Sequence, residues 1–282
     1  MPNQPRHVIR RSGLLVASSC AVAVLIGFAT VHFGSGWRMR QWPVVPQTIK
    51  VPARGDAVEG ARLATVLGCR DCHGPDMSGR AECYEEAGRF RLVCPNVTAM
   101  RKHYDDRALV TLLRFGLLRN GALVDFMPWD MYAQLTDDDM GHLLAFLRAI
   151  PSVQKELPPS SYSWTTKWDM LRGEYPLRNN LDDYDTKTLS GPAEQGRYLA
   201  GVLCAECHAP SLRGYPGDDA PNLIVAKAYS SAEFARLMRD GITIAGTESR
   251  SGLMTRTARK RFAQLRPNEV AAMKLYLDQR VP

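Results

Sequence analysis

The pattern of apolar and polar positions separates a long apolar run at the amino terminus from two amphipathic regions. Residues 12–31 carry no charge and are mostly apolar, and three arginines precede them within residues 6–11. About 20 apolar residues cross a bilayer as a helix, so the run predicts a transmembrane helix within residues 1–33. A cleaved signal peptide has a shorter apolar region and a small-residue cleavage site. Residues 29–33 offer no good site, which favours an uncleaved anchor over a signal that is removed.

Each amphipathic region contains three segments with the helical spacing of apolar residues. The expected helices cover residues 56–68, 105–118 and 137–149 in the first region, and 192–203, 231–240 and 267–279 in the second. Ser230 with Glu233 forms a capping box at the start of one helix. Thr136 and Pro267 suit the starts of the two last helices. Loops rich in Gly and Pro separate the segments, so we expect an all-α fold.

The second amphipathic region repeats the first, which divides the chain into domains. Gly60-Ala-Arg-Leu-Ala-Thr-Val-Leu-Gly-Cys69 matches Gly196-Arg-Tyr-Leu-Ala-Gly-Val-Leu-Cys204, and Pro95-Asn96-Val97 matches Pro221-Asn222-Leu223. We expect an anchor at residues 1–33, a tether at 34–54, a first domain at 55–150, a linker at 151–190 and a second domain at 191–282. The aromatic residues of the linker lead us to expect that it packs on the domains.

Composition and charge narrow the classes of function. Apolar residues make up 45% and charged residues 23% of the 282 residues, which argues against wholesale disorder. The formal net charge of +7 comes from residues 1–54, which hold seven basic residues and no acid, so the remainder is neutral. A general basic face for nucleic acid is therefore not supported. A few short helices in about 95 residues bury only a thin core, so we expect a large buried cofactor in each domain.

The candidate chemistry lies in two short motifs. Cys69-Arg-Asp-Cys72-His73 and Cys204-Ala-Glu-Cys207-His208 both follow C-x-x-C-H, the pattern of c-type haem attachment. Two thiols three residues apart on a helical turn can form thioethers with the two vinyl groups of one porphyrin. The adjacent histidine then lies under the ring and can ligate the iron. One such motif could instead be a pair of thiols that is redox-active or binds zinc. Two matched copies that follow a membrane-targeting segment favour two covalently bound haem c groups.

The second axial ligand decides what each haem does, because Met together with His raises the reduction potential and leaves no open position. Four methionines, Met77, Met140, Met238 and Met273, align with apolar packing positions of the other copy, and Met131 aligns with Arg261. Met127 remains in the loop before the last helix of the first copy, and Met254 is the only methionine in the equivalent loop of the second. The expected iron ligands are therefore His73 with Met127, and His208 with Met254.

Each copy resembles the small, soluble-type cytochrome c fold. The shared features are a glycine and an aromatic residue on crossing first and last helices, C-x-x-C-H, Pro-Asn-Leu and a distal Met-Pro. The crossing pairs in this chain are Gly60 with Phe146 and Gly196 with Tyr276. The resemblance covers residues 55–150 and 191–282 and implies a membrane-anchored dihaem cytochrome c. The departures are Val97 in place of Leu, Thr255 in place of Pro after Met254, and an insertion before Pro95.

The resemblance implies two further features. In the family, the carbonyl of the Pro in Pro-Asn-Leu accepts from the second ring nitrogen of the proximal histidine, and Pro95 and Pro221 would take this role. The insertion of the first copy carries Cys83 and Cys94, which have no counterpart in the second copy. Covalent haem attachment implies the oxidising side of the membrane, where disulfides persist. We therefore expect a Cys83–Cys94 bridge rather than two free thiols.

These features favour an electron-transfer protein over an enzyme. Single electrons would pass from a respiratory-chain or periplasmic dehydrogenase donor to an oxidase or a soluble cytochrome acceptor. A dihaem cytochrome c peroxidase is the enzymatic alternative. It needs one haem with an open position, and a methionine in both copies argues against it. A further alternative is that the chain is a fixed subunit of a larger respiratory or dehydrogenase complex. It would still transfer electrons through the same haems, and only its partner proteins would differ from those of the main hypothesis.

The expected location is the inner (cytoplasmic) membrane of a bacterium, crossed once, with both haem domains in the periplasm. A basic cluster follows Met254 and comprises Arg256, Arg259, Lys260, Arg261 and Arg266. This cluster has two interpretations. It is either a docking patch for an acidic redox partner or a solvent-exposed face of a helix or loop. His103 and His142 are expected to be surface or structural residues.

Overall fold

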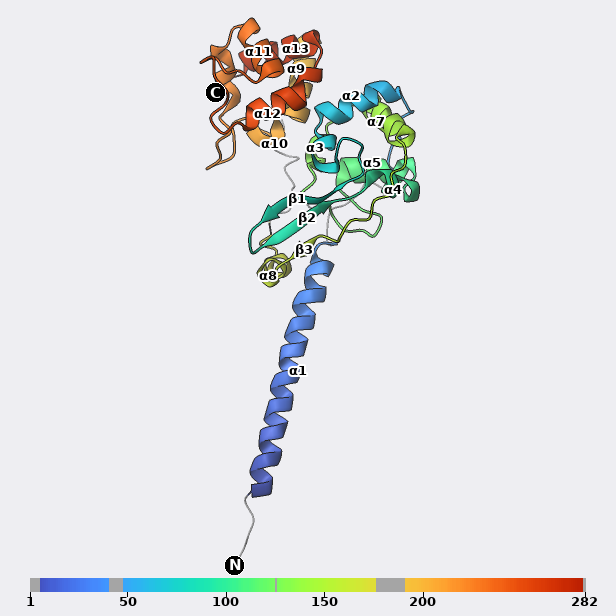
Figure 1. Cartoon of the computed structure of the whole chain (residues 1–282), viewed down its shortest axis with the longest axis vertical. Helices are drawn as coiled ribbons and strands as arrows, with labels where there is room; N and C mark the ends of the chain where they lie inside the picture. The colour runs from blue at the N-terminus through green and yellow to red at the C-terminus, as the bar shows by residue number, and fades with distance from the viewer. Residues whose placement is uncertain (1–5, 41–47, 125, 176–190, 281–282) are drawn as a thin grey trace, which may run out of the picture.

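The computed structural model describes residues 6–40, 48–124, 126–175 and 191–280. One long helix, α1 (Arg6–Arg38), projects away from two neighbouring helical units (Figure 1). The first unit, of helices α2 to α7, follows α1 in the chain, and the second unit, of helices α9 to α13, completes it. The mostly helical character predicted from the sequence is confirmed.

The main helices of both units lie where the sequence predicts them. The first unit contains α2 (Ala57–Val66), α3 (Cys69–His73), α4 (Val97–Met100), the 3-10 turn η1 (Arg101–His103), α5 (Asp106–Phe115), α6 (Trp129–Tyr132) and α7 (Asp137–Ala149). The second contains α9 (Gly191–Leu203), α10 (Ala205–His208), η3 (Leu223–Ala228), α11 (Ser231–Asp240), α12 (Leu253–Lys260), η4 (Phe262–Gln264) and α13 (Pro267–Gln279). The helix α12 was not predicted, because the sequence analysis treated those residues as a loop.

Side chains at the predicted helix starts satisfy free backbone N–H groups. The hydroxyl of Thr136 accepts from the backbone of Asp139 at 3.1 Å, before α7. Ser230 and Glu233 form the expected reciprocal capping box at the start of α11. Pro267 occupies the first turn of α13, where a missing N–H costs nothing. These local signals explain why the helix boundaries could be read from the sequence.

The first and last helices of each unit cross at a glycine. A Cβ atom at Gly60 would lie 2.0 Å from the carbonyl oxygen of His142 and 2.7 Å from Cβ of Phe146. A Cβ atom at Gly196 would lie 2.0 Å from a carbonyl oxygen of α13 and 2.8 Å from Cβ of Tyr276. Both crossings are therefore too close for any larger residue. The same geometry occurs in both units, with α2 packed on α7 and α9 packed on α13.

Ion pairs and a shared core join the two units. Arg62 on α2 donates to Glu269 on α13 at 2.8 Å, and Arg266 donates to Glu59 at 2.5 Å. The buried apolar residues of both units form one continuous cluster. The two units therefore pack against each other directly.

A small β-sheet covers one side of the first unit and corrects the all-α prediction. The antiparallel strands β1 (Arg80–Glu86), β2 (Phe90–Cys94) and β3 (Ser161–Tyr162) lie in the order β1-β2-β3. The sequence analysis treated residues 80–94 only as an insertion and missed these strands. Along β2 the buried residues Phe90 and Leu92 alternate with more exposed ones. An alternating pattern this short does not distinguish a strand from a helix in the sequence.

The linker packs on the first unit, as expected from its aromatic residues. The side-chain amide of Asn96 donates to the carbonyl of Val153 at 2.9 Å, and Lys155 donates to the carbonyl of Gly79 at 2.7 Å. The linker then forms β3 and an unpredicted helix, α8 (Trp164–Arg172). Its remaining part, residues 176–190, lies outside the described residues.

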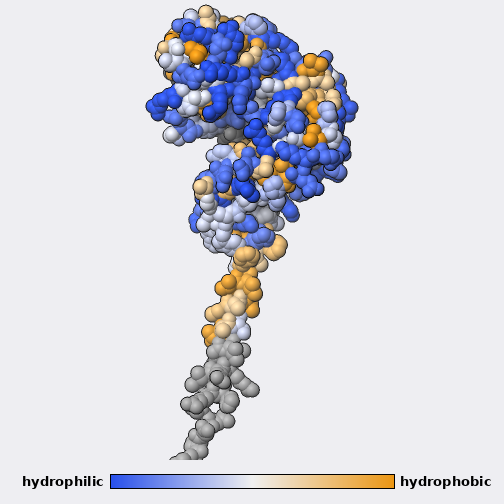
Figure 2. Space-filling model, in the orientation of Figure 1, coloured by the Kyte–Doolittle hydropathy of each residue, from blue (hydrophilic) through white to orange (hydrophobic). Residues whose placement is uncertain are grey.

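The carboxyl end of α1 packs on α8. The rings of Phe28 and Trp164 stack with their centroids 4.6 Å apart, and Val31 and Ser35 are buried. The first residues of the expected tether therefore belong to the helix. Residues Val16–Arg38 are long and apolar enough to cross a membrane, and Figure 2 shows apolar surface along the part of this helix that it colours.

Replacing Gly60 with Ala tests the helix crossing. The added methyl group overlaps a backbone oxygen, so we expect the free energy of unfolding to fall by about 2 kcal/mol or more, measured by denaturant unfolding. Gly36→Ala is the control, because no heavy atom lies within 4 Å of its Cβ position on α1. Equal stability of Gly60→Ala and the wild type would contradict this packing.

Candidate haem-attachment sites

Each C-x-x-C-H motif lies on a single helical turn that follows the first helix of its unit. Gly68, with φ of 80°, turns the chain from α2 into α3, and Gly74, with φ of 82°, ends α3. In the second unit Cys204 precedes α10, which carries Cys207 and His208. In the first unit glycine adopts the left-handed conformation of these turns without strain, whereas in the second unit Ala209 takes the positive φ, of 61°, after α10.

Both motif histidines are oriented by a proline carbonyl. Nδ1 of His73 lies 2.9 Å from the carbonyl oxygen of Pro95, and Nδ1 of His208 lies 2.7 Å from that of Pro221. The carbonyl can only accept, so Nδ1 carries the proton and Nε2 keeps its lone pair for a metal. Burial lowers the pKa of both histidines, although the proline contacts oppose this shift. The neutral imidazole that iron requires is therefore favoured.

Burial raises the pKa of three motif thiols. Burial raises the pKa of Cys69 to about 11 and the pKa of Cys204 to about 12. Burial also raises the pKa of Cys72, and the carboxylate of Glu206 from the second unit adds to the rise. The thiols of Cys69, Cys72 and Cys204 in the haem-free chain are thus protonated at neutral pH. A carboxylate of the second unit therefore changes the pKa of a motif thiol in the first unit.

The two expected methionine ligands are more exposed than the core methionines, and Met100 on α4 shares their intermediate burial. Met127 and Met254 are partly buried and pack against the core cluster. The core methionines are nearly inaccessible, with relative exposures of 4% or less, and comprise Met77, Met131, Met140, Met238 and Met273. Met254 lies in the first turn of α12 rather than in a loop. The next residue, Thr255, donates to the carbonyl of Gly241 at 2.7 Å and so ties α12 to α11.

The residues present fit haem c. Each unit offers two thiols at the attachment spacing and one histidine with a free Nε2. Within the described part of the chain, Nε1 of Trp129 and Nε of Arg236 are buried donors without a partner. Trp129 follows Met127 closely in the first unit, and Arg236 lies on α11 of the second. Haem carboxylates are acceptors that would satisfy such donors.

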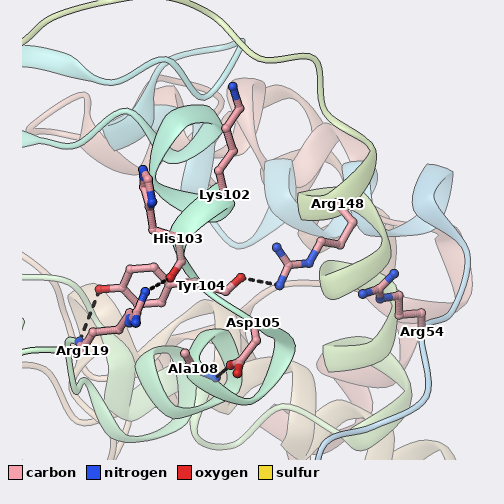
Figure 3. Close-up of a pocket in the computed structure, with 8 residues that line it drawn as sticks. All are labelled: Arg54, Lys102, His103, Tyr104, Asp105, Ala108, Arg119 and Arg148. Atoms are coloured by element: carbon pink, nitrogen blue, oxygen red, sulfur yellow. Dashed lines mark hydrogen bonds between the residues drawn. The ribbon is translucent and has the colours of Figure 1, made fainter.

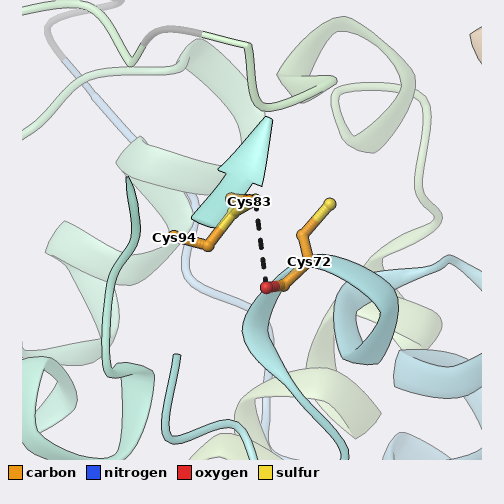
Figure 4. A group of neighbouring side chains, drawn as sticks. All are labelled: Cys72, Cys83 and Cys94. Atoms are coloured by element: carbon orange, nitrogen blue, oxygen red, sulfur yellow. Dashed lines mark hydrogen bonds between the residues drawn. A yellow bond between two sulfur atoms is a disulfide. The ribbon is translucent and has the colours of Figure 1, made fainter. Parts of the chain in front are cut away.

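The expected Cys83–Cys94 disulfide is present and lies beside the first motif. It joins β1 to β2, with Cα atoms 5.5 Å apart. Figure 4 shows the bridge next to Cys72, and the three sulfur atoms lie within 4.8 Å of one another. Cysteines that are bridged do not ligate a metal, so we do not interpret this group as a metal cluster. The bridge closes the hairpin, and Sγ of Cys83 lies 3.9 Å from the carbonyl oxygen of Cys72 on α3.

A charged pocket of about 550 Å³ lies elsewhere in the first unit (Figure 3). It is lined by Arg54, Lys102, His103, Tyr104, Asp105, Ala108, Arg119 and Arg148. None of the expected iron ligands or motif cysteines lines it. His103 therefore belongs to a polar surface, as expected. His142 is structural, because its Nδ1 accepts from the backbone of Asp56 at 2.7 Å.

The structure divides the basic cluster that follows Met254. Arg256 and Lys260 are exposed, and Arg259 pairs with Glu248 at 2.7 Å. Arg266 and Arg261 instead bind carboxylates of the first unit. The docking interpretation was wrong for these two arginines, because they belong to the interface between the units. Sequence spacing alone could not reveal this, since their partners are about 200 residues away in the chain.

Comparisons with known proteins agree with the motifs. A diheme cytochrome c-type protein of Cereibacter sphaeroides is 27% identical over 259 residues, which cover 81% of this chain and 86% of the relative. The cytochrome c subunit of a quinone-dependent alcohol dehydrogenase of Gluconobacter oxydans is 28% identical over 75% of this chain, and a fructose dehydrogenase cytochrome subunit of Gluconobacter japonicus is 28% identical over 64%. The matches span 43% and 40% of these two relatives. No protein-family model matches the chain.

These similarities extend over most of the chain and support a dihaem c-type cytochrome. They also support electron transfer as its activity and haem c as its cofactor.

Removing the disulfide tests its structural role. We expect the Cys83→Ser, Cys94→Ser double variant to lose about 3 kcal/mol of unfolding free energy, because the bridge closes a short loop. Denaturant unfolding measures the loss, and Cys20→Ser is the control because Cys20 is exposed and free. Alkylation of the unreduced, denatured haem protein should label Cys20 alone. Two further labelled thiols would contradict the bridge.

Proposed function

We propose that the chain is a membrane-anchored dihaem cytochrome c that carries single electrons between a dehydrogenase or respiratory donor and an oxidase or soluble cytochrome acceptor. The observation that carries this proposal is the matched geometry of the two motifs. Each has paired thiols on one helical turn and a histidine whose Nδ1 is held by a proline carbonyl. Residues 55–150 and 191–282 are then two cytochrome c domains.

The side chains around each site have separate roles. Cys69 and Cys72 attach one haem, and Cys204 and Cys207 attach the other. Haem c supplies a one-electron couple between two iron oxidation states. His73 and His208 bind the iron through Nε2, and Pro95 and Pro221 fix the tautomer and the plane of each ring.

The methionines decide whether the sites are open. Met127 and Met254 complete the coordination, which raises the potential and excludes other ligands. The buried apolar cluster around each site keeps water out, so that little solvent reorganises when the charge changes. Closed, dry sites of this kind suit electron transfer rather than chemistry on a bound substrate.

The partners follow from the surface and from the relatives. Two of the relatives are cytochrome subunits of dehydrogenases, which supports a dehydrogenase as the donor. The exposed Arg256, Arg259 and Lys260 offer a positive surface to an acidic partner. The helix α1 anchors the chain in the inner membrane, with both units in the periplasm.

Haem counting tests the proposed function. We expect the purified full-length chain to contain two covalently bound haems that are reducible by one electron each, measured by the pyridine haemochrome spectrum and reductive titration. Cys69→Ala with Cys72→Ala should leave one haem, and so should Cys204→Ala with Cys207→Ala. Fewer than two haems in the wild type would contradict the proposal.

Methionine replacement tests the axial ligands. The near-infrared band of the oxidised protein marks a Met–iron bond. It should fall by about half in Met127→Leu and in Met254→Leu and vanish in the double variant, because each contributes one bond. Met131→Leu is the control, since Met131 is a buried core residue. Carbon monoxide binding by the wild type would show an open haem and favour a peroxidase.

A further inference from the structure

One arginine lies between the two haem-attachment motifs. Arg261, at the carboxyl end of α12, donates from Nε to Asp71 of the first unit at 2.6 Å and from Nη1 to Glu206 of the second at 2.8 Å. Asp71 is the residue before Cys72, and Glu206 is the residue before Cys207. The same guanidinium therefore binds the same position of both C-x-x-C-H motifs.

The arginine is held tightly in this position. Its side chain is only 14% exposed. A Cβ atom at Gly68 would lie 2.3 Å from the guanidinium carbon, so the group rests on the backbone where the first motif begins. A planar guanidinium can bind two carboxylates at once in a fixed geometry, whereas a lysine ammonium is a compact point charge. The geometry thus fixes the two motifs relative to each other.

Other contacts are sufficient to join the units. Arg62 binds Glu269 across the interface, Arg266 binds Glu59, and the hydroxyl of Tyr198 donates to Asp139. None of these residues lies within a C-x-x-C-H motif. A role for Arg261 in mere adhesion would therefore duplicate a function that three other pairs supply.

We propose that Arg261 is the positioning residue for electron transfer between the two haem sites. This inference rests on the proposed function. Arg261 holds the segments that carry Cys72 and Cys207 face to face, and the chain Asp71–Arg261–Glu206 forms a hydrogen-bonded bridge between them. One electron leaves the reduced site as the other site gains it, so the step needs no proton and no further reactant.

The Arg261→Gln variant tests the proposal against Arg62→Gln. Both arginines are similarly buried, with 14% and 16% of the side chain exposed, and both bind carboxylates of the two units. Only Arg261 touches the motifs. The full-length protein with both haems receives one electron from a flash-excited flavin. Transient absorbance then follows redistribution between the haems, whose individual spectra and potentials come from a redox titration.

We expect the rate between the haems to fall about tenfold or more in Arg261→Gln, because transfer depends steeply on the placement of the reacting groups. The potentials of both haems should also fall, since two carboxylates near the attachment sites lose their counter-ion. Arg62→Gln should leave the rate and both potentials unchanged. Relative to Arg261→Gln, the Arg261→Lys variant should recover part of the loss in both haem potentials, because lysine keeps the positive charge. It should not recover the rate, because one ammonium group does not bind both carboxylates in the fixed geometry of a guanidinium.

The outcomes separate this proposal from the proposed function. Two reducible haems with an unchanged rate in Arg261→Gln would overturn the role of Arg261 and leave the electron-transfer function intact. A wild type without two haems would overturn both. If Arg261→Gln does not mature, Glu206→Ala decides the question, because it removes the acceptor at one end of the bridge and leaves the arginine on Asp71. An unchanged rate and unchanged potentials in that variant would also overturn the proposal.

Discussion

The close crossing of the first and last helices at a glycine is the constraint on which each unit depends. At Gly60 and at Gly196 a backbone carbonyl of the last helix occupies the space that a side chain would need. The crossing fixes where the first helix ends, and the attachment turn begins directly after that end. The aromatic residues Phe146 and Tyr276 pack against the same glycines. A unit with so few helices has little other means of placing its motif reproducibly.

Several ion pairs lie in the interface between the units. Asp71 and Glu206 face each other beside the buried thiols and repel unless a cation lies between them. Removing such charges from water costs free energy that their attraction only partly returns. A paired interface of this kind favours one arrangement of the units over others rather than adding much stability. One arrangement is what transfer between two fixed sites requires.

The first unit carries additions that the second lacks. The disulfide hairpin, the strand β3 and the helix α8 lie on the side of the first unit where α1 meets the folded body (Figure 1), and β1 contacts the motif helix α3. The last turns of α1 pack on α8, so this helix is joined to the folded body by contacts as well as by the chain. Figure 1 shows the second unit at the end of the molecule opposite the free end of α1. The exposed Arg256 and Lys260 therefore belong to the unit that lies farther from that end.

The sequence by itself determined the features that depend on neighbours along the chain. Helix positions followed from apolar spacing and from caps such as Thr136 and Ser230, and the attachment motifs are contiguous. The crossing at Gly60 and Gly196 followed from the resemblance to the cytochrome c fold. Only the tertiary structure decided the β-sheet, the helix α8, the packing of α1 and the place of Arg261. Each of these depends on a partner far away in the chain, and a basic residue has the same sequence signature whether it faces solvent or bridges two partly buried carboxylates.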